Sequence, residues 1–199
     1  IKGVDEYQEL LRCSVAFAGN DHRLGAQEAP PAIISIFLGT ELESIIDAIV
    51  DENDYTDAER KTLRIGVDVL PSIPQDTTDR NRTSPVAFTG NKFEFRMPGS
   101  SQSIAGPATI LNAIMADELH TFYEALKDAP NFTAALHSLI RDAFASHRRI
   151  IFNGNGYEAA WVAEAERRGL TNLRNTAEAL PAYILPKNID MLTSQGIYT

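Results

Sequence analysis

Three charged residues, Lys92, Glu94 and Arg96, alternate with apolar residues near the middle of the chain. Successive side chains of a β-strand point to opposite faces. These three therefore share one face, each roughly 6.5–7 Å from the next, while Phe93 and Phe95 face the core. Carboxylate oxygens are ligands that Mg²⁺ prefers, and the two flanking cations can hold anions. The row indicates a divalent-metal site at Glu94 between two anion-binding groups. The alternative is a half-buried strand with a solvated charged face.

A polar loop with two arginines lies ahead of this strand. Residues 79–84 read DRNRTS, so Arg80 and Arg82 stand close together. Guanidinium groups bind phosphate oxygens through paired hydrogen bonds, which makes the loop a candidate phosphate site. The alternative is an ordinary surface loop in which Asp79 pairs with a neighbouring arginine.

A third polar segment, residues 20–31 (NDHRLGAQEAPP), is predicted to be a loop because a glycine and two prolines interrupt it. Loops of this kind often carry functional residues. Glu28 could act there as a base or as part of a lid, and His22 as a ligand. The alternative is a surface loop whose polar side chains are hydrated.

Hydrophobic periodicity predicts the elements that position these residues. The expected strands cover residues 32–38, 65–70, 86–89 and 91–97, and the expected helices cover residues 4–18, 40–50, 56–64, 108–127, 131–151 and 158–168, with a weaker helix from Asn175. Strands and loops dominate the middle and helices the rest, which indicates an α+β fold whose last part is all-helical. A boundary near residue 128 divides the chain into units 1–127 and 128–199.

Capping residues mark several of the expected helix ends. Thr40 and Glu43 have the spacing of a capping box, Asn131 and Asn175 can cap the helices that follow them, and Gly169 occupies a C-cap position. The first helix begins almost at the first residue without a preceding cap. We therefore expect the chain to be a piece of a longer protein.

The composition is that of an ordinary globular protein, with 44% hydrophobic and 23% charged residues among 199. The net charge of −9 argues against nucleic acid, which requires a clustered basic face. The longest apolar run, Ala32–Leu38, is far shorter than the roughly 18–20 residues that cross a bilayer, so we expect no membrane partner. Cys13 is the only cysteine, and no signal peptide is recognisable. We therefore expect no intrachain disulfide and a reducing, cytoplasmic setting.

Four strings follow one another along the chain: NDHRLGAQEAPPAIISIFLG from residue 20, DRNRTSP from residue 79, GNKFEFRMPGSS from residue 90 and FNGNGY from residue 152. Together they resemble type III glutamine synthetases over essentially the whole chain. The resemblance implies an α+β fold that is part of a mostly antiparallel catalytic sheet with flanking helices, followed by an all-helical C-terminal region. It also implies an internal segment. The family's small N-terminal domain, its first E-x-E metal motif and its glycine-rich stretch with a following histidine are expected upstream, and its chain is expected to continue beyond Thr199.

The resemblance implies three roles on the glutamate side of an active site. Arg23, in the RLG stretch, would contact substrate glutamate. Arg96, in the E-x-R strand, would bind the substrate carboxylate. Glu28, in the EAP stretch, would lie on a flap that closes the glutamate site and helps to take a proton from ammonium.

The resemblance also implies roles on the nucleotide side. Arg82 would meet the phosphates of ATP, Lys92 would lie near the nucleotide, and Glu94 would bind Mg²⁺ or Mn²⁺. Other glutamine synthetases carry a further phosphate-site arginine at the position of Ala87. This departure leaves Lys92 as the candidate replacement.

The implied reaction joins ammonia to L-glutamate through γ-glutamyl phosphate and uses ATP. The expected partners are therefore glutamate, ammonia and ATP, with no nucleic acid and no membrane. Active sites of the family form between neighbouring subunits, so we expect a ring-shaped homo-oligomer for the intact protein and no activity for this chain alone.

Two other classes of protein are alternatives. Guanidino kinases normally carry a reactive cysteine in the substrate site, whereas Cys13 lies in an apolar helical stripe. A non-catalytic helical ligand-binding or assembly module is the second alternative, and the KFEFR and DRNRTS runs argue against it.

Overall fold

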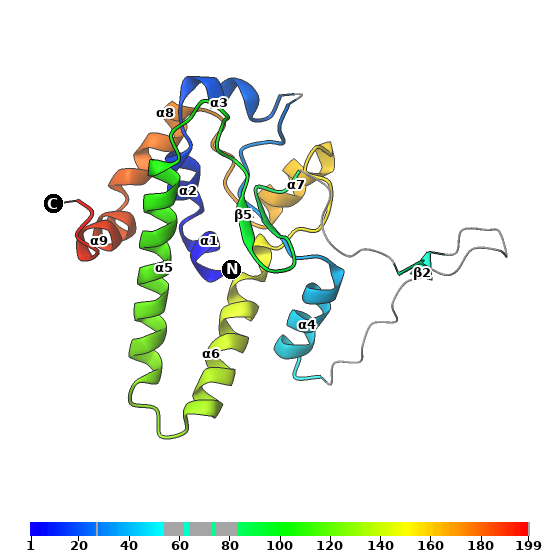
Figure 1. The fold of residues 1–199 in the computed structure, drawn as a ribbon, viewed down its shortest axis with the longest axis vertical. Helices are drawn as coiled ribbons and strands as arrows, with labels where there is room; N and C mark the ends of the chain where they lie inside the picture. Colours follow the sequence, from blue (N-terminus) through cyan, green and yellow to red (C-terminus); the bar gives the residue numbers. More distant parts are fainter. Residues whose placement is uncertain (27, 54–61, 64–72, 75–82, 199) are drawn as a thin grey trace.

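The computed structural model describes residues 1–26, 28–53, 62–63, 73–74 and 83–198 (Figure 1). The helices as far as residue 147 are α1 (Lys2–Glu6), α2 (Gln8–Ser14), α3 (Ala18–Arg23), α4 (Thr40–Val50), α5 (Ala105–Leu126) and α6 (Phe132–His147). The later helices are η1 (Arg148–Ile150), α7 (Ala159–Arg167), α8 (Thr176–Ala179), η2 (Leu180–Ile184) and α9 (Pro186–Ser194). The strands are β1 (Ile36–Phe37), β2 (Thr62–Leu63), β3 (Ile73–Pro74), β4 (Val86–Phe88) and β5 (Phe93–Phe95).

The main sheet has three strands in the order β1-β4-β5. β1 pairs with β4 in parallel, with Ile36 opposite Val86, and β4 pairs with β5 antiparallel, with Ala87 opposite Glu94. β2 and β3 form a separate antiparallel pair. The α+β class is confirmed. The described sheet is mixed, however, because one of its two pairings is parallel, so the mostly antiparallel sheet is not seen in the described residues.

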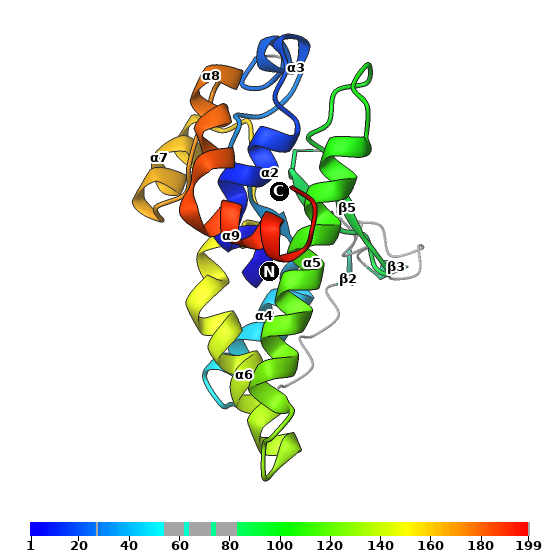
Figure 2. The same ribbon diagram turned by 90° about the vertical axis from the view of Figure 1, so that its left-hand side faces the viewer.

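One hydrophobic cluster joins the two ends of the chain to the sheet. Its buried members include Leu10, Ile34, Ile36, Ile110, Ile150, Trp161 and Leu192. α5 packs against α2 and α9, and α5 and α6 form a long hairpin (Figures 1 and 2). The cluster draws on residues before and after position 128, where a domain boundary stays a prediction.

Helix α5 is buried over only part of the expected apolar stripe. Ile110 and Ile114 lie in the core, whereas Met115, Leu119 and Tyr123 are exposed. The second half of α5 extends past the core beside α6, as Figure 1 shows, so those side chains meet little of the rest of the described chain. Periodicity therefore predicted the helix correctly but not how far its stripe is covered.

The N-terminal region is not the expected single helix over residues 4–18. α1 is capped at Tyr7, whose hydroxyl donates to Asp117 Oδ2 at 2.7 Å, and α2 is capped at Val15. α3 then includes Asn20, which was expected in a loop but is helical and completely buried. Tertiary contacts accompany these changes: Tyr7 bonds Asp117 on α5, and Asn20 Nδ2 donates to the Met97 carbonyl oxygen just beyond β5.

The expected strands are shorter than the sequence pattern indicates. Residues 32–36 are buried, but only Ile36–Phe37 form a strand, because Ile33 bonds back to Pro31 and bridges Asn172 instead of extending the ladder. Of the helix expected over residues 56–64, only Thr62–Leu63 are described, and they form β2. The strand expected over residues 65–70 lies outside the described residues.

Three of the expected caps are confirmed and one is wrong. Asn131 Oδ1 accepts from the Ala134 backbone N–H, Asn175 Oδ1 accepts from that of Glu178, and Gly169 has the positive φ of a helix C-terminus. The capping box at Thr40 does not form, since α4 starts at that residue behind Gly39, with no side-chain cap.

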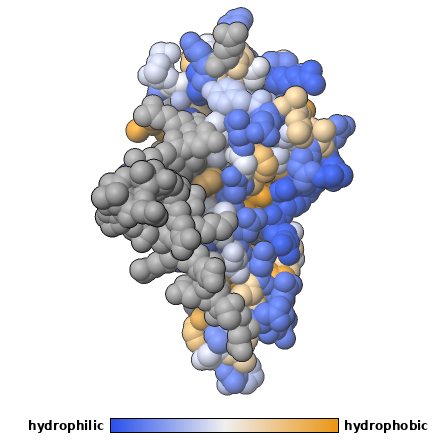
Figure 3. All heavy atoms as spheres, turned by 90° about the vertical axis from the view of Figure 1, so that its right-hand side faces the viewer, coloured by the Kyte–Doolittle hydropathy of each residue, from blue (hydrophilic) through white to orange (hydrophobic). Residues whose placement is uncertain are grey.

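The described surface is mostly hydrophilic in the view of Figure 3, with small separate hydrophobic areas. Across the described ranges, no helix has both the length and the apolar character needed to span a membrane.

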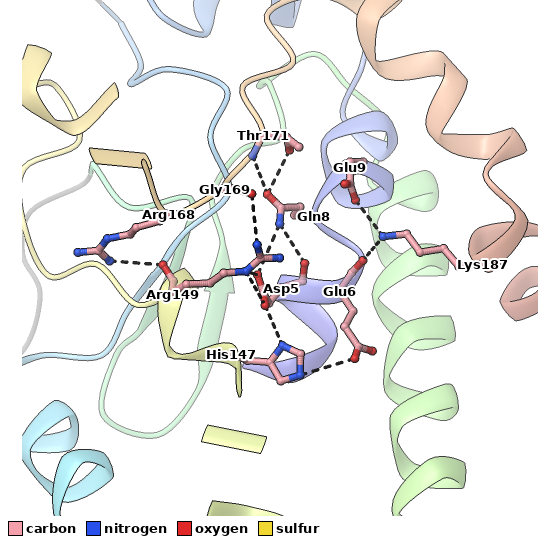
Figure 4. A network of polar contacts seen from close by, with 10 residues as sticks. All are labelled: Asp5, Glu6, Gln8, Glu9, His147, Arg149, Arg168, Gly169, Thr171 and Lys187. Carbon is pink, nitrogen blue, oxygen red and sulfur yellow. Dashed lines mark hydrogen bonds and ion pairs between the residues drawn. The ribbon is translucent and has the colours of Figure 1, made fainter. Parts of the chain in front are cut away.

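A polar network around Asp5 ties the N-terminal helices to the C-terminal part (Figure 4). The Asp5 carboxylate, only 2% exposed, accepts from His147 Nδ1 at 2.7 Å and from Arg149 Nε at 2.9 Å. Gln8 Oε1, on the next helix, accepts from the backbone N–H and the hydroxyl of Thr171. Buried polar groups are costly unless they are paired, so these bonds define one arrangement of the two ends.

We expect Asp5→Ala to lower the free energy of unfolding by about 3 kcal/mol, because Arg149 and His147 lose a buried acceptor. The matched control is Asp47→Ala, which breaks the exposed 2.7 Å pair with the neighbouring Arg148 and should cost less than about 1 kcal/mol. Chemical denaturation of both variants measures the difference. Equal losses of unfolding free energy in the two variants would show that the buried Asp5 pairs stabilise the fold no more than an exposed ion pair does.

Candidate functional site

The side chain of Arg23 is held at the end of α3 by two acceptors. Its Nε donates to Asn20 Oδ1 at 2.9 Å, and its Nη2 donates to the carbonyl oxygen of Met97 at 2.5 Å. Met97 directly follows Arg96, just beyond β5. Two arginines from separate sequence motifs are thus placed in the same region of the fold.

The row on β5 has the predicted one-sided arrangement. Glu94 Oε2 accepts from Arg96 Nε at 3.1 Å, and Glu94 Oε1 lies 3.4 Å from Lys92 Nζ. The hydrogen bonds from Arg96 and then Lys92 hold the pKa of Glu94 below its ordinary value. Glu94 is therefore an anion at neutral pH, as a metal ligand must be.

The opposite face of β5 is covered less than the alternation predicts. Met97 is buried and Phe95 is half-buried, but Phe93 is 56% exposed, so the expectation that Phe93 is buried is wrong. The Phe93 ring stands at the Gly90 turn, where its centroid lies 5.2 Å from that of Phe88 on β4. Phe93 is the first residue of β5, directly after the turn from β4, so its side chain lies at the rim of the core rather than inside it.

Arg23, Glu28 and Arg96 line one open pocket of about 50 Å³. Other parts of its wall come from residues 29–31 and 83–85. Two arginines and one glutamate therefore line the same pocket, from the end of α3, the following loop and the end of β5. Glu28 is exposed at this pocket, where a small movement of its loop would change its distance from a bound molecule.

The other predicted site residues have different placements. Lys92 and Glu94 continue the row from Arg96 along β5 and do not line the pocket. Arg82 lies outside the described residues. Ala87 is completely buried on β4 directly opposite Glu94.

A turn in the C-terminal part supports the pocket, and sequence reasoning identified it only as a turn. The backbone N–H of Gly156 donates to Thr83 Oγ1 at 3.1 Å, and its Cα lies against Pro30. Asn153 Oδ1 accepts from the backbone N–H groups of Leu38 and Gly39 at 2.9 Å. The paired Asn-Gly motif was the available signal, since such residues adopt tight turns and allow close backbone approach.

Glu94 can supply one oxygen ligand for a divalent cation. The charge of its carboxylate and its place on the open face of β5 suit that role. In the part of the chain that the structure describes, no group of three or more His, Cys, Asp or Glu side chains is arranged around a common metal position. The described residues therefore fit one ligand of a metal site and do not form a whole one.

Cys13 does not have the environment of a reactive thiol. It is 4% exposed on α2, and burial raises its pKa to about 11, although the neighbouring Arg12 lowers it somewhat. Thiolates are the reactive form of cysteine, so this residue is suited to the core rather than to chemistry. A guanidino kinase site at Cys13 is therefore not supported.

The chain is similar in sequence to known glutamine synthetases. Residues 135–199 match the family model described as the glutamine synthetase C-terminal domain. The chain is 46% identical over 99% of its length to a type-3 glutamine synthetase of Dictyostelium discoideum. It is 43% identical over 98% of its length to a glutamine synthetase of Bacteroides fragilis, and 42% identical over 100% of its length to one of Butyrivibrio fibrisolvens.

These similarities confirm the resemblance to type III glutamine synthetases along nearly the whole chain. The chain spans 27% to 28% of the length of these relatives, which is about a quarter of each.

We expect Gly156→Ala to disturb the pocket wall. A methyl group there would lie 2.9 Å from the Thr83 carbonyl oxygen and 3.2 Å from Pro30 Cβ, so the backbone or the loop must shift, at about 1–3 kcal/mol of stability. Gly106→Ala is the matched control, because its methyl group would meet only Ser14 O at 3.4 Å. Thermal unfolding of both variants measures the cost, and a Gly156→Ala protein as stable as the control would contradict the close contact.

We expect Cys13 to resist a thiol reagent at pH 7 while the protein is folded. With a pKa of about 11 the thiol stays protonated until the solution is strongly alkaline, and its burial excludes the reagent. The absorbance of the thiolate that the reagent releases measures the reaction. A urea-unfolded sample is the control, and it must react. Rapid reaction of the folded protein would overturn the assignment of Cys13 to the core.

Proposed function

We propose that the chain is a segment of a type III glutamine synthetase and that it supplies the glutamate side of the active site in the complete protein. The activity is the ligation of ammonia to L-glutamate through γ-glutamyl phosphate, with ATP as co-substrate. The observation that carries the proposal is the convergence of Arg23, Glu28 and Arg96 on one pocket. The sequence similarity over the whole chain supports the same assignment.

Arg23 and Arg96 bind the substrate carboxylate. Planar guanidinium groups match carboxylate geometry through paired hydrogen bonds, and two of them in one pocket attract a dicarboxylate such as glutamate. Arg23 already uses Nε and Nη2 to hold its own position, which leaves its remaining donors to face the ligand. Fixing the substrate in this way lowers the entropic part of the barrier to reaction.

Glu28 takes a proton from ammonium before ammonia attacks. A general base must come within hydrogen-bond reach of the proton that it removes, and Glu28 is exposed at the same pocket as the two arginines. Its position on a loop allows closure over the substrate, which excludes water and protects the acyl phosphate from hydrolysis.

Lys92, Glu94 and Arg82 serve the nucleotide side. Glu94 would hold Mg²⁺ or Mn²⁺, and a bound divalent cation neutralises charge on the transferring phosphoryl group. Ala87 and Glu94 are directly opposite on neighbouring antiparallel strands, so a side chain at position 87 would stand next to Glu94. Lys92, 3.4 Å from Glu94, is the cation placed to compensate for the missing arginine.

The complete protein supplies the remaining parts of the site. We expect its added strands to make the catalytic sheet mostly antiparallel, and the remaining metal ligands to come from outside the described residues. A ring-shaped homo-oligomer in the cytoplasm completes the proposal. Among the described residues, Glu28 is the carboxylate that lines the pocket, and no group of three or more His, Cys, Asp or Glu side chains is arranged to hold a metal ion, which supports that division of labour.

We expect Arg96→Ala in the complete protein to raise the KM for glutamate and to lower kcat, with kcat/KM falling at least about tenfold, because a charged hydrogen bond to the substrate is lost. Arg141→Ala removes an arginine paired with Glu52 on the surface and should leave both constants unchanged. Steady-state glutamine formation measures both variants. Unchanged values of KM and kcat for Arg96→Ala would remove that residue from the site.

The 199-residue chain alone should form no glutamine from glutamate, ammonia and Mg·ATP. Turnover by the isolated chain that Glu94→Ala abolishes would show that the chain holds a complete site.

A further inference from the structure

Asn20 is a polar side chain that the proposed chemistry does not use and that the structure buries completely. It lies on α3 and is 0% exposed, next to the pocket-lining arginine of the same helix. A buried amide without hydrogen bonds is costly, so the partners of Asn20 indicate what it does.

Two of its three side-chain hydrogen bonds join parts of the site, and the third holds it to Val15 at the end of α2. Asn20 Nδ2 donates to the carbonyl oxygens of Val15 at 2.8 Å and Met97 at 3.0 Å, while Oδ1 accepts from Arg23 Nε at 2.9 Å. Arg23 Nη2 donates to the same Met97 oxygen at 2.5 Å. Asn20, Arg23 and the Met97 carbonyl thus form a closed triangle.

The orientation of the amide follows from its partners. Arg23 Nε can only donate, and the two carbonyl oxygens can only accept, so the amide must present its oxygen to Arg23 and its nitrogen to the carbonyls. An amide group of this length meets all three demands. A carboxylate would oppose two carbonyl oxygens, and an aliphatic side chain would satisfy none of the three.

We infer that Asn20 is the positioning residue for Arg23 and that it sets the distance between the Arg23 and Arg96 guanidinium groups to suit a substrate carboxylate. The triangle anchors Arg23 to the backbone of Met97, which directly follows Arg96, so the two arginines share one rigid reference point. A long arginine side chain is otherwise free to take many rotamers, and a carboxylate site needs guanidinium groups held in place. This inference rests on the proposed function, because it assigns glutamate to the pocket.

The test uses the complete protein with Asn20→Asp and Asn20→Leu. Both variants should raise the KM for glutamate by about tenfold while the KM for ATP stays within about twofold, because only the glutamate pocket loses its geometry. The matched control is Asn188→Leu. Asn188 is also 0% exposed and donates to a carbonyl oxygen, that of Ala182, but it lies in α9 away from the pocket. This control should lower the thermal stability without a selective change in the KM for glutamate.

Two further measurements separate positioning from a purely structural role. In an Arg23→Ala background, Asn20→Asp should cause no additional rise in the KM for glutamate, because residues that act as one unit are not additive. Arg23→Lys should raise it nearly as much as Arg23→Ala, since lysine keeps the charge but lacks the guanidinium geometry of the triangle. This second variant keeps the test decisive even if both Asn20 variants fail to fold.

The outcomes distinguish the two levels of inference. If the wild-type complete protein forms no glutamine, the proposed function fails. If it forms glutamine but the Asn20 variants keep the wild-type KM for glutamate, only the positioning role is overturned. A wild-type KM for Arg23→Lys would overturn the positioning role together with the paired hydrogen bonds assigned to Arg23. Equal rises in the KM for glutamate and for ATP would assign Asn20 to general stability and would also overturn it.

Discussion

The buried carboxylate of Asp5 is the contact on which the joining of the two ends of the chain depends. Asp5 lies on α1, and its donors are His147, the last residue of α6, and Arg149 in η1. Arg149 also donates to the carbonyl oxygen of Gly169 after α7, at 3.3 Å. A carboxylate removed from water requires such donors, so α1 has one favourable position against the C-terminal part.

Buried charged groups that need partners also link α2 to the candidate site. Arg12 is fully buried on α2 and donates to Asp21 Oδ1 at 2.9 Å and to the Leu173 carbonyl oxygen at 2.7 Å. Asp21 Oδ2 accepts from the Thr176 backbone N–H at 2.7 Å. Burial raises the pKa of Asp21, but the hydrogen bonds from Thr176 and Arg12 outweigh it and hold that pKa below its ordinary value. The C-terminal segment therefore holds α3 at Asp21, the residue that follows Asn20.

The C-terminal helical part consequently does more than cover the sheet. Its residues hold α3 through Asp21, and its Gly156 turn supports Thr83 and Pro30 beside the pocket. The pocket that Arg23, Glu28 and Arg96 line is thus bounded by loops whose positions depend on both halves of the chain. A substitution in this part can act on the proposed site without touching a substrate.

Local sequence rules succeeded where local geometry decides the outcome. The two-residue period of a strand placed Lys92, Glu94 and Arg96 on one face, and side-chain capping by Asn131 and Asn175 depends only on residues within one helical turn. The same rules failed at the first helix, at the exposed Phe93 ring and at the buried Asn20, because distant contacts decide whether a periodic segment breaks and how deeply it is covered.

By itself the sequence determined which residue types are available for chemistry, their order in the motifs and the one-sided row on β5. The tertiary structure alone decided that Arg23, Glu28 and Arg96 meet at one pocket, that Asn20 joins Arg23 to Met97, and that a distant Asn-Gly turn supports the wall. The physical reason is that these contacts link segments far apart along the chain. Their geometry follows from how the whole core packs and from where each buried polar group finds a partner, and no local spacing contains that information.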